Sequence, residues 1–407
     1  MTYDIVIIGG GAAGIATAAS VLKRNAKVTI AIADPATDHF YQPGWTMVGA
    51  GVFTLEQTRK AEADVMPEGV EWIRLPAITI EPDRNAITLG NGDTLTYHVL
   101  IVAPGLRLAW EKIEGLPQAL GRNGVTSNYR YDLAPYTYEL VKSLRRGRAL
   151  FSQPPMPIKC AGAPQKAMYL SCDIWRDDGV LPAIDVEFHN AGGALFGVAT
   201  YVPALMEYVE KYGIDLKFES NLVAVDGDRR IATFERKQGV VSERIEREFD
   251  MLHVVPPQVS HNVVAQSALA AANGFDEATL RHKRYDNVFA LGDAAGTSNA
   301  RTAAAARKQA PVVAVNALAA LDGKPPVADY DGYGSCPLTV ERGKVVLAEF
   351  GYGGKLLPSF PSWLLDGTRP TRAAWFLKER MLPPIYWQGM PKRREWMATP
   401  YEIGKAA

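Results

Sequence analysis

The sequence predicts an α/β protein that contains two tandem Rossmann-like domains and an amphipathic C-terminal segment. Three observations predict this class. A β-branched run, a glycine-rich turn and a small-residue helix stand at the N-terminus, and a second strand–turn–helix pattern surrounds residues 148–175. After residue 360, aromatic and basic residues are mixed. The first two patterns are typical of parallel strands joined by helices.

Composition excludes several other classes. The 407 residues are 47% hydrophobic, enough for two or three domains with buried cores. Lys plus Arg and Asp plus Glu number 44 each, so no overall field favours nucleic acid. The three cysteines are scattered and form no CxxC pair, so we expect neither a zinc site nor a disulfide-stabilised fold. We expect no cleavable signal peptide and no transmembrane helix, because no apolar run approaches ~18 residues.

The first domain is predicted to be discontinuous, comprising residues 1–111 and 251–325. It begins with one βαβ unit, and its Pro-, Gly- and aromatic-rich stretch at 35–51 predicts a structured loop or a pair of short helices. The expected strands are 3–8, 27–33, 71–75, 77–81, 86–89, 99–102 and 287–291, and the expected helices are 12–22 and 302–321.

The second Rossmann-like domain is predicted at residues 112–250 and has no glycine-rich nucleotide motif. We interpret the apolar run 251–255 as the return of the chain to the first domain, and residues 326–407 as a separate C-terminal region. The expected elements of the second domain are a helix at 136–145, strands at 148–152, 185–190 and 215–225, a strand–turn–helix over 159–175 and a polar hairpin at 231–249.

A dinucleotide site is predicted at the start of the first domain. The run Gly9-Gly10-Gly11-Ala12-Ala13-Gly14 fits GxGxxG after a strand and at the start of a helix. Glycines let the backbone approach a pyrophosphate, and the helix N-terminus favours its negative charge. Asp34 ends the next strand, where a carboxylate accepts hydrogen bonds from a ribose diol and disfavours a 2′-phosphate.

The segment from Val288 to Asp293 indicates that the dinucleotide is FAD. It places Asp293 between a late strand and a helix, which fits contact with a flavin ribityl chain; an ordinary helix N-cap is the alternative. With the turn Ala103-Pro104-Gly105, the pattern resembles flavoproteins of the disulfide reductase-like superfamily, which have two dinucleotide-binding domains. In the second domain, Cys160 and Pro164 stand where a pyrophosphate would need glycines, so we expect nicotinamide not to be the electron donor.

Two of the three cysteines are candidate redox residues. Cys160 precedes a predicted helix and lies close in sequence to Lys159 and Lys166, all of which favour a thiolate. Cys336 follows a turn and precedes a predicted strand. Cys172 is twelve residues beyond Cys160, roughly 18 Å along a helix, so it cannot bridge to Cys160 and is assigned to packing. Two unrelated structural thiols at Cys160 and Cys336 remain the alternative.

Several segments carry a more specific resemblance: HFYQPGWTMVGAG, IKCAGAPQKAMYLSCD, NVFALGDAAG, RTAAAARKQ, YDGYGSCPL and VVLAEFGY. They resemble sulfide:quinone oxidoreductase, in particular the branch that includes the mitochondrial enzyme, over nearly the whole chain. The resemblance implies FAD and a sulfane-sulfur-bridged catalytic pair, Cys160 and Cys336. It also implies oxidation of hydrogen sulfide, reduction of ubiquinone or another membrane quinone, and a small sulfur acceptor such as sulfite, glutathione or polysulfide.

The same resemblance assigns the cofactor contacts. The loop from Tyr41 to Trp45 contains no cysteine that could tether a flavin, so FAD is expected to be noncovalent. Lys355 and Arg301 stand near positions where the family has lysines, and either could supply positive charge to reduced flavin. The expected cofactor-binding residues are Gly9, Gly11, Gly14, Asp34, Pro43, Ala103, Gly105, Gly292, Asp293, Arg301, Thr302 and Lys355.

The C-terminal region is predicted to face quinone and membrane. Four tryptophans follow residue 360, namely Trp363, Trp375, Trp387 and Trp396, and a helix is expected over 373–387 until Pro383 and Pro384 break it. Aromatic residues mixed with Lys and Arg fit a monotopic anchor of a peripheral membrane protein, on either face of the membrane. An interface in a homo-oligomer uses the same residue types and is the alternative. Phe350, Tyr352 and Phe360 are the residues expected around the quinone ring.

The predicted activity is FAD-dependent oxidation of sulfide to persulfide- or polysulfide-level sulfur, with two electrons passed to a membrane quinone. Two alternatives stay open. An NADH-dependent quinone or polysulfide reductase would be reduced by NADH, and a noncatalytic sulfur-binding flavoprotein would turn over no donor.

Overall fold

The first domain is built on a seven-stranded sheet. The structure is a computed structural model that describes residues 2–239, 241–270 and 274–403. The strand order is β5-β2-β1-β8-β7-β6, and β19 also pairs with β8. Its strands are β1 (Thr2–Ile8), β2 (Ile30–Ala33), β5 (Val70–Ile73), β6 (Ala77–Glu81), β7 (Ala86–Leu89), β8 (Thr94–Val102) and β19 (Val288–Ala290). The pairs β1–β2, β1–β8, β2–β5 and β8–β19 are parallel, whereas β6, β7 and β8 pair antiparallel.

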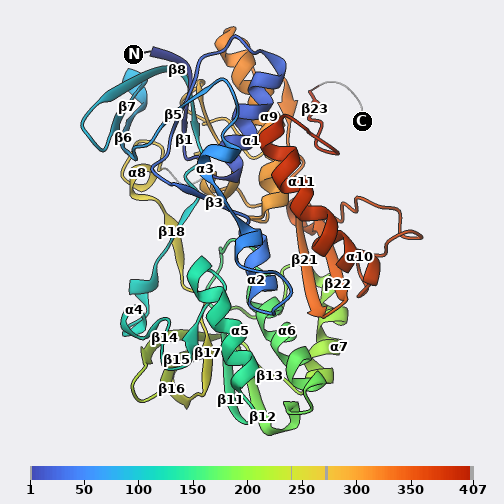
Figure 1. The fold of residues 1–407 in the computed structure, drawn as a ribbon. Coiled ribbons are helices and arrows are strands. Elements are labelled where there is room, and N and C mark those ends of the chain that lie inside the picture. Colours follow the sequence, from blue (N-terminus) through green and yellow to red (C-terminus); the bar gives the residue numbers. More distant parts are fainter. Residues whose placement is uncertain (1, 240, 271–273, 404–407) are drawn as a thin grey trace.

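Two long helices cover one face of this sheet, as Figure 1 shows. They are α1 (Ala12–Arg24) and α9 (Ala303–Leu321), which confirm the expected helices. Successive side chains of a strand point to opposite faces. Ile5 and Ile7 of β1 accordingly pack with residues of α1 and α9, whereas Val6 and Ile8 pack in a second cluster on the other face. Burial on both faces explains why β1 ends in a continuous apolar run at residues 5–8.

The second domain contains a parallel sheet in the order β10-β17-β11-β12-β13. Its strands are β10 (Val125–Thr126), β11 (Gly147–Gln153), β12 (Ile184–Asn190), β13 (Asp215–Lys217) and β17 (Met251–His253). The helices of this domain are α4 (Leu116–Ala119), α5 (Ala134–Ser143), α6 (Ala163–Asp177) and α7 (Val202–Tyr212). An antiparallel sheet of β14 (Ser220–Asp226), β15 (Ile231–Gln238) and β16 (Val241–Glu248) is attached to it and confirms the polar hairpin.

Two sequence predictions for this domain are wrong. The run at 251–255 does not return the chain to the first domain, because β17 pairs with β10 and β11 inside the second sheet. The single strand expected at 215–225 is instead two strands, β13 in the parallel sheet and β14 in the antiparallel one. In both cases an apolar run showed that a strand forms, but not which partner it pairs with.

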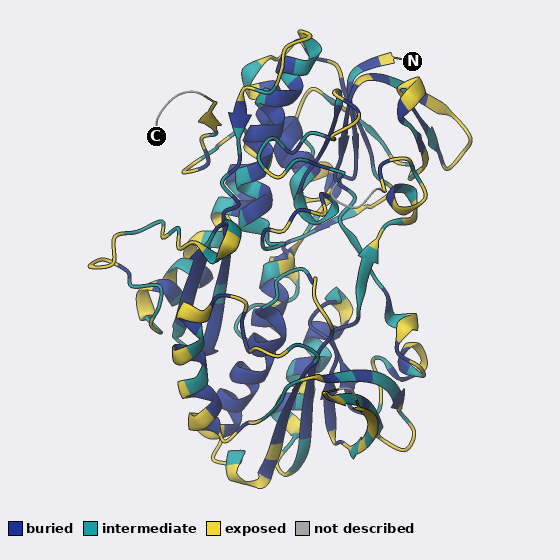
Figure 2. Ribbon diagram, turned by 180° about the vertical axis from the view of Figure 1, so that it is seen from behind, coloured by how far each residue is buried: buried dark blue, intermediate teal, exposed yellow. Residues whose placement is uncertain are grey.

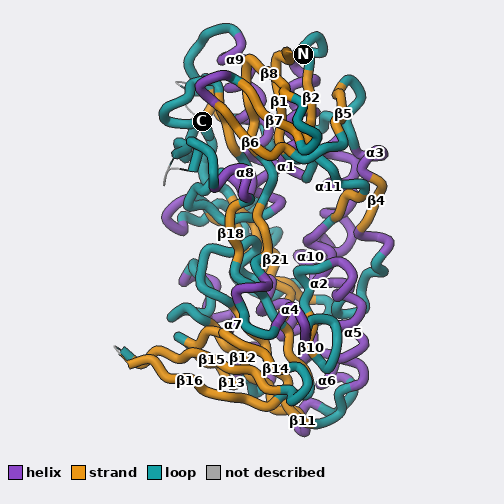
Figure 3. Tube along the Cα trace, turned by 90° about the vertical axis from the view of Figure 1, so that its left-hand side faces the viewer, coloured by secondary structure: helices purple, strands orange, loops and turns teal. Residues whose placement is uncertain are grey.

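The two domains are joined by an antiparallel ribbon of β9 (Leu106–Leu108) and β18 (Gln258–Ser260), which lies between them in Figure 3. The return to the first domain therefore follows Pro256 and Pro257. Smaller elements complete the first domain: β3 (Asp38–Phe40), β4 (Arg59–Ala61), α2 (Trp45–Val48), α3 (Glu62–Val65) and α8 (Asn262–Ala265). The short helix α2 confirms a structured segment within residues 35–51.

The C-terminal region spans both domains along one side of the molecule (Figure 1). A hairpin of β21 (Gly334–Glu341) and β22 (Lys344–Phe350) packs against α6 of the second domain. The chain continues through a projecting loop, visible in Figure 2, into α10 (Arg372–Phe376), a π-helical turn (Leu377–Met381) and α11 (Leu382–Gly389). The strands β20 (Ala328–Asp329) and β23 (Tyr401–Glu402) pair near the end of the described chain.

Pro383 and Pro384 do not break the C-terminal helix, contrary to the sequence prediction. They occupy the first turn of α11, directly after the π-helical turn, so one helical path runs from Arg372 to Gly389. The change from the π-helical turn to α11 interrupts the regular hydrogen-bond pattern at these two residues, so their missing N–H groups are tolerated there. Within the described ranges, no helix is both long and apolar enough to cross a bilayer.

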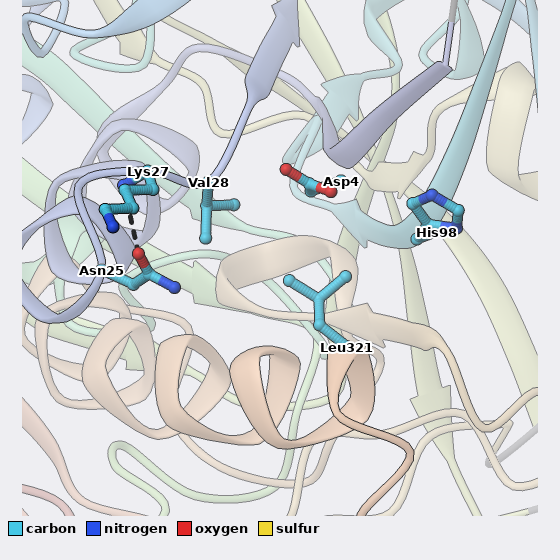
Figure 4. A pocket seen from close by; sticks show the side chains of 6 residues that line it. All are labelled: Asp4, Asn25, Lys27, Val28, His98 and Leu321. Atoms are coloured by element: carbon cyan, nitrogen blue, oxygen red, sulfur yellow. Dashed lines mark hydrogen bonds between the residues drawn. The ribbon is translucent and has the colours of Figure 1, made fainter.

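A surface pocket of about 380 Å³ lies at the edge of the first sheet (Figure 4). Its lining comes from the start of β1, the end of α1, β8 and the end of α9, and includes Asp4, Lys27, His98 and Leu321. None of the candidate site residues contributes to this lining. The chemistry of the chain therefore has to be sought elsewhere.

Candidate functional site

Cys160 and Cys336 face each other where the C-terminal hairpin meets the second domain. Their Sγ atoms are 3.8 Å apart although 176 residues separate them in sequence. Cys160 is half-buried in the loop between β11 and α6, and Cys336 is buried within β21. Cys336 therefore lies inside the strand, not before it as the sequence suggested. The two thiols are close enough for disulfide or persulfide exchange after a small movement.

Two buried lysines accompany the cysteine pair. Lys166 Nζ, on the first turns of α6, is 3.2 Å from Cys160 Sγ, and Lys378 comes from the π-helical turn of the C-terminal region. The hydrogen bond with Cys336 and the charges of Lys166 and Lys378 hold the pKa of Cys160 well below its usual range. The hydrogen bond with Cys160 and burial raise the pKa of Cys336. Cys160 is therefore the member of the pair that carries the thiolate.

Lys378 is a site residue that the sequence analysis missed. Only 3% of it is exposed, and burial, together with repulsion from Lys166, lowers the pKa of its ammonium group to about 7. In the sequence, Lys378 is one of several cations in an aromatic, basic tail, a pattern that indicates lipid contact. The π-helical turn that aims it inward has no recognisable sequence signal, although such turns are frequent at functional sites.

Cys172 is separate from this pair. It lies within α6, is fully buried, and its pKa is raised by burial in an apolar cluster that includes Trp175 and Phe188. Its surroundings are those of a packing residue.

The glycine-rich turn forms a cradle for a dinucleotide. A Cβ atom on Gly9 would lie 2.4 Å from the carbonyl oxygen of Ala103, and the φ of Gly9 is +98°. A Cβ atom on Gly14 would lie 1.9 Å from the carbonyl oxygen of Gly9. A Cβ atom on Gly11, at the N-cap of α1, would have no neighbouring heavy atom within 4 Å. The outer glycines are thus needed for packing, and the middle one borders open space where a pyrophosphate fits.

The other expected cofactor residues surround this cradle. Asp34 Oδ2 accepts the backbone N–H of Gly10 at 2.5 Å, which places its carboxylate beside the turn. The Ala103-Pro104-Gly105 turn follows β8 directly, next to Gly9. On the other side, the N–H of Gly292 donates to Gln309 Oε1 at 2.8 Å, and Thr302 caps α9 by accepting the N–H of Ala305 at 3.1 Å.

The cofactor loops are connected to the cysteine loop. The carbonyl of Arg301 accepts the N–H of Cys160 at 2.7 Å. Lys159 Nζ donates to Gln42 Oε1 at 2.6 Å, which places Pro43 and its turn next to the cysteine loop. Burial raises the pKa of the Asp293 carboxyl, while the charges of Lys159 and Arg301 oppose that rise. Asp293, Arg301 and Cys160 therefore share one site between the two domains.

Comparisons with known proteins agree with this arrangement. A family model described as pyridine nucleotide-disulphide oxidoreductase matches residues 3–145. The mitochondrial sulfide:quinone oxidoreductase of Dictyostelium discoideum is 40% identical over 96% of this chain and 86% of that protein. The mitochondrial sulfide:quinone oxidoreductase of Mus musculus is 36% identical over 95% of this chain and 86% of that protein. The chain belongs to the sulfide:quinone oxidoreductase family.

A solved sulfide:quinone oxidoreductase shares the fold. The X-ray structure of the enzyme from Aquifex aeolicus superposes with a TM-score of 0.78 at 17% identity, covering 96% of this chain and 92% of that chain. This confirms the α/β architecture expected from the sequence. The sulfide:quinone oxidoreductase family is flavin-dependent, and the cradle around Gly11 fits the dinucleotide part of a flavin cofactor.

Lys355, which was expected to supply positive charge near the flavin, lies in the turn that follows β22. Its side chain is exposed, and its backbone closes a short turn by hydrogen bonds with Gly351 and Tyr352. The turn after β22 contains Gly353 and Gly354, both with positive φ. Among the described residues, the buried cation that the C-terminal region contributes to the cysteine pair is Lys378.

The three residues expected around the quinone ring pack in different places. Phe350 makes an edge-on contact with Phe196 of the second domain, at 5.8 Å between ring centroids. Tyr352 contacts Tyr330 in the core of the first domain. Phe360 packs against the cluster of Val345 and Leu347 under α10. They do not form a single aromatic cage in this sulfide:quinone oxidoreductase fold.

The tail tryptophans divide into inward and outward residues. Trp387 is 8% exposed and packs against Tyr41 and His39 of the first domain, so it is a core residue. Trp363 is 84% exposed on the projecting loop, and Trp396 is 48% exposed. The tail tryptophans therefore do not share one outward face, because Trp387 is internal whereas Trp363 and Trp396 are exposed at separate places.

Proposed function

We propose that the chain oxidises hydrogen sulfide with a membrane quinone as the electron acceptor, using Cys160 and Cys336 as its redox pair. The observation that carries the proposal is the placement of the two sulfur atoms. They lie 3.8 Å apart, with Lys166 on the thiolate, in a loop bound to the flavin-binding domain through Arg301. Membership of the sulfide:quinone oxidoreductase family supports the same activity.

The distance between the sulfur atoms suits a bridged pair. Two S–S bonds of about 2.05 Å span at most about 4.1 Å. One sulfane sulfur atom could therefore bridge Cys160 and Cys336 with little movement, and a direct disulfide would need the two residues to approach further.

The sulfur step that we propose is a thiol–disulfide exchange. Hydrosulfide attacks the Cys336 sulfur of the disulfide form, a new S–S bond forms, and the bond to Cys160 breaks. Cys336 then carries the persulfide, and Cys160 leaves as a thiolate, which the charge of Lys166 stabilises. A nucleophilic acceptor such as sulfite, glutathione or a polysulfide removes the outer sulfur of the persulfide. Re-forming the disulfide releases two electrons, and noncovalently bound FAD would accept them and deliver them to the quinone.

The cofactor and domain assignments belong to the same proposal. We assign Gly9, Gly11, Gly14 and Asp34 to the pyrophosphate and ribose of FAD, and Asp293 to its ribityl chain. The flavin-binding domain comprises residues 1–111 together with the segment that follows Pro257 up to 325. The second domain supplies Cys160, and the C-terminal region supplies Cys336 and Lys378.

Quinone and membrane are proposed to meet at the projecting loop and α10. The exposed apolar side chains there are Trp363, Leu364, Phe376 and Met381, and the exposed cations between them are Arg369, Arg372 and Arg380. Aromatic rings and cations in this mixture suit a headgroup layer, so the protein would be a peripheral membrane protein. The π-helical turn, which carries Lys378 on its inner face, would connect the membrane surface to the redox site.

Anaerobic absorbance of the purified flavoprotein tests the proposal. Sulfide should bleach the flavin and a soluble quinone analogue should restore its colour, whereas NADH should do neither. Cys160→Ser and Cys336→Ser should each lose sulfide-dependent quinone reduction, and Cys172→Ala should retain it as the matched control. Bleaching by NADH would instead support an NADH-dependent reductase, and turnover of neither donor would support a noncatalytic sulfur-binding flavoprotein.

A further inference from the structure

Tyr129 contacts the backbone of the redox cysteine, although it lies in a different part of the chain. It follows β10 in the second domain and is 4% exposed. Its hydroxyl donates to the carbonyl oxygen of Lys159 at 2.9 Å and lies 3.2 Å from the carbonyl oxygen of Cys160. One hydroxyl hydrogen is therefore shared between two consecutive carbonyl groups, on either side of the Cys160 α-carbon.

The Cys160 backbone is in a conformation that needs such support. Its φ is +50°, in the left-handed region that few residues other than glycine adopt without cost. The N–H of Cys160 donates to the Arg301 carbonyl at 2.7 Å, and its carbonyl accepts the N–H of Ala163 at 2.7 Å. Together with Tyr129, these bonds hold the peptide groups on both sides of the cysteine.

The direction of the Cys160 side chain depends on this backbone. A rotation about φ toward the ordinary region would move Cβ and swing the sulfur away from its present neighbours. Those neighbours are Cys336 Sγ at 3.8 Å and Lys166 Nζ at 3.2 Å. We propose that Tyr129 is a positioning residue, which keeps the Cys160 sulfur between Cys336 and Lys166 by holding the Cys160 peptide in its left-handed conformation. The inference rests on the proposed redox role of this pair.

Tyr129 is itself rigidly held. Its N–H donates to Ser127 Oγ at 3.1 Å, and the N–H of Asn128 donates to His253 Nε2 at 2.9 Å. Its ring packs in a cluster with Ile158 and Val255, and Cys160 lies against the same cluster. Because the Tyr129 backbone is hydrogen-bonded and its ring is packed, its hydroxyl can restrain the cysteine loop and does not simply follow it.

Tyr129→Phe tests the inference, because it removes only the hydroxyl and leaves the ring in its cluster. We expect the variant to keep its flavin and its KM for quinone, while flavin reduction by sulfide slows about ten-fold, the effect of one lost buried hydrogen bond. In the reduced protein, alkylation of Cys160 should slow at neutral pH, and its pH midpoint should rise as the thiolate leaves Lys166. Amide hydrogen exchange at residues 159–161 should become faster.

Tyr169→Phe is the matched control. It also removes a buried tyrosine hydroxyl that donates to a carbonyl, that of Leu205 at 3.1 Å, without a hydrogen bond to the cysteine loop. A general loss of packing would affect both variants alike. If Tyr129 positions Cys160, the alkylation profile and the amide exchange should change in Tyr129→Phe only. An unchanged alkylation profile and exchange rate in Tyr129→Phe would overturn the inference.

The alkylation measurement needs neither sulfide nor quinone, so it separates two kinds of failure. If the wild-type protein does not reduce quinone with sulfide but Tyr129→Phe still shifts the alkylation profile, the proposed function fails and the positioning role stands. If the wild-type protein is active and the profile does not move, the positioning role alone fails.

Discussion

Lys166 Nζ lies 3.2 Å from the Cys160 sulfur, and the lysine is only 3% exposed. A buried ammonium group without a partner would have a lowered pKa, because burial disfavours its charged form. Here the neighbouring sulfurs of Cys160 and Cys336 outweigh burial and raise the pKa of Lys166. The two groups thus stabilise each other as a thiolate and an ammonium, so the thiolate that leaves the disulfide in the proposed reaction has a charge partner.

Lys166→Met should therefore make Cys160 a poorer leaving group and lower its thiolate fraction at neutral pH. Without the ammonium group the pKa of the thiol rises, and each unit of increase lowers the thiolate fraction about ten-fold at a pH below the pKa. Flavin reduction by sulfide should slow by at least that factor and recover as the pH is raised. Stopped-flow reduction between pH 6 and pH 10 measures this.

Lys142→Met is a suitable control for that experiment, because Lys142 is a partly exposed lysine of the same domain that pairs with Asp178. It should behave like the wild-type protein. If the pH profile of flavin reduction in Lys166→Met coincided with those of the wild-type protein and Lys142→Met, the ion pair would not set the reactivity of Cys160.

Alanine substitutions at Gly11 and Gly9 of the nucleotide turn should have different effects. Gly11→Ala adds a methyl group where there is open space, so stability without FAD should change by no more than about 0.5 kcal/mol. The same methyl group intrudes on the pyrophosphate position, and FAD affinity should fall at least ten-fold. Gly9→Ala combines a positive φ with a 2.4 Å contact to Ala103 and should destabilise the protein itself by several kcal/mol.

Fluorescence titration of apoprotein with FAD, together with chemical denaturation, distinguishes the two variants. Equal losses of stability in Gly11→Ala and Gly9→Ala would contradict the assignment of Gly11 to the ligand side of the turn.

Local patterns predicted the dinucleotide turn, most strands and the candidate cysteines, because each depends on residues close in sequence. The partners of β17 depend on contacts across many residues, which apolar runs do not encode, and the pairing of Cys160 with Cys336 was implied only by the family resemblance. Lys378 could not be assigned because a lysine in a basic, aromatic tail is usually solvated, and only the structure shows that it is buried in the π-helical turn. Lys355 was assigned by family position, and its side chain is exposed in the turn after β22.

The exposed apolar side chains of the projecting loop and α10 predict membrane binding that can be separated from catalysis. A triple variant, Trp363→Ser, Phe376→Ser and Met381→Ser, removes side chains that are 84%, 57% and 45% exposed. Burying one such side chain in an apolar phase is worth about 1.5–3 kcal/mol when complete. Sedimentation with anionic vesicles should therefore fall at least ten-fold, while turnover with a water-soluble quinone analogue stays near the wild-type rate.

Val241→Ser is the control for this surface, because Val241 is 63% exposed on β16 of the second domain. It should bind vesicles like the wild-type protein. If it lowered binding as much as the triple variant does, the membrane-facing surface would have to be placed elsewhere.

His253 predicts that the fold loses stability in mild acid. It is fully buried on β17, burial lowers its pKa to about 3, and its Nε2 accepts the N–H of Asn128 at 2.9 Å. An unfolded histidine has a pKa of about 6.5, so between these two values the unfolded chain binds the extra proton and stability falls with falling pH. At pH 5 the loss from this one group is about 2 kcal/mol relative to pH 7.

His253→Gln retains an acceptor for the Asn128 N–H group but cannot titrate. The free energy of unfolding of this variant should therefore depend less on pH than that of the wild-type protein. Carboxylates continue to titrate in both proteins. The measurement is the free energy of unfolding in urea at a fixed FAD concentration, taken from pH 7 to pH 5. Over that interval this free energy should fall by about 2 kcal/mol less in the variant than in the wild-type protein. Parallel curves for the two proteins would mean that another group accounts for the acid sensitivity.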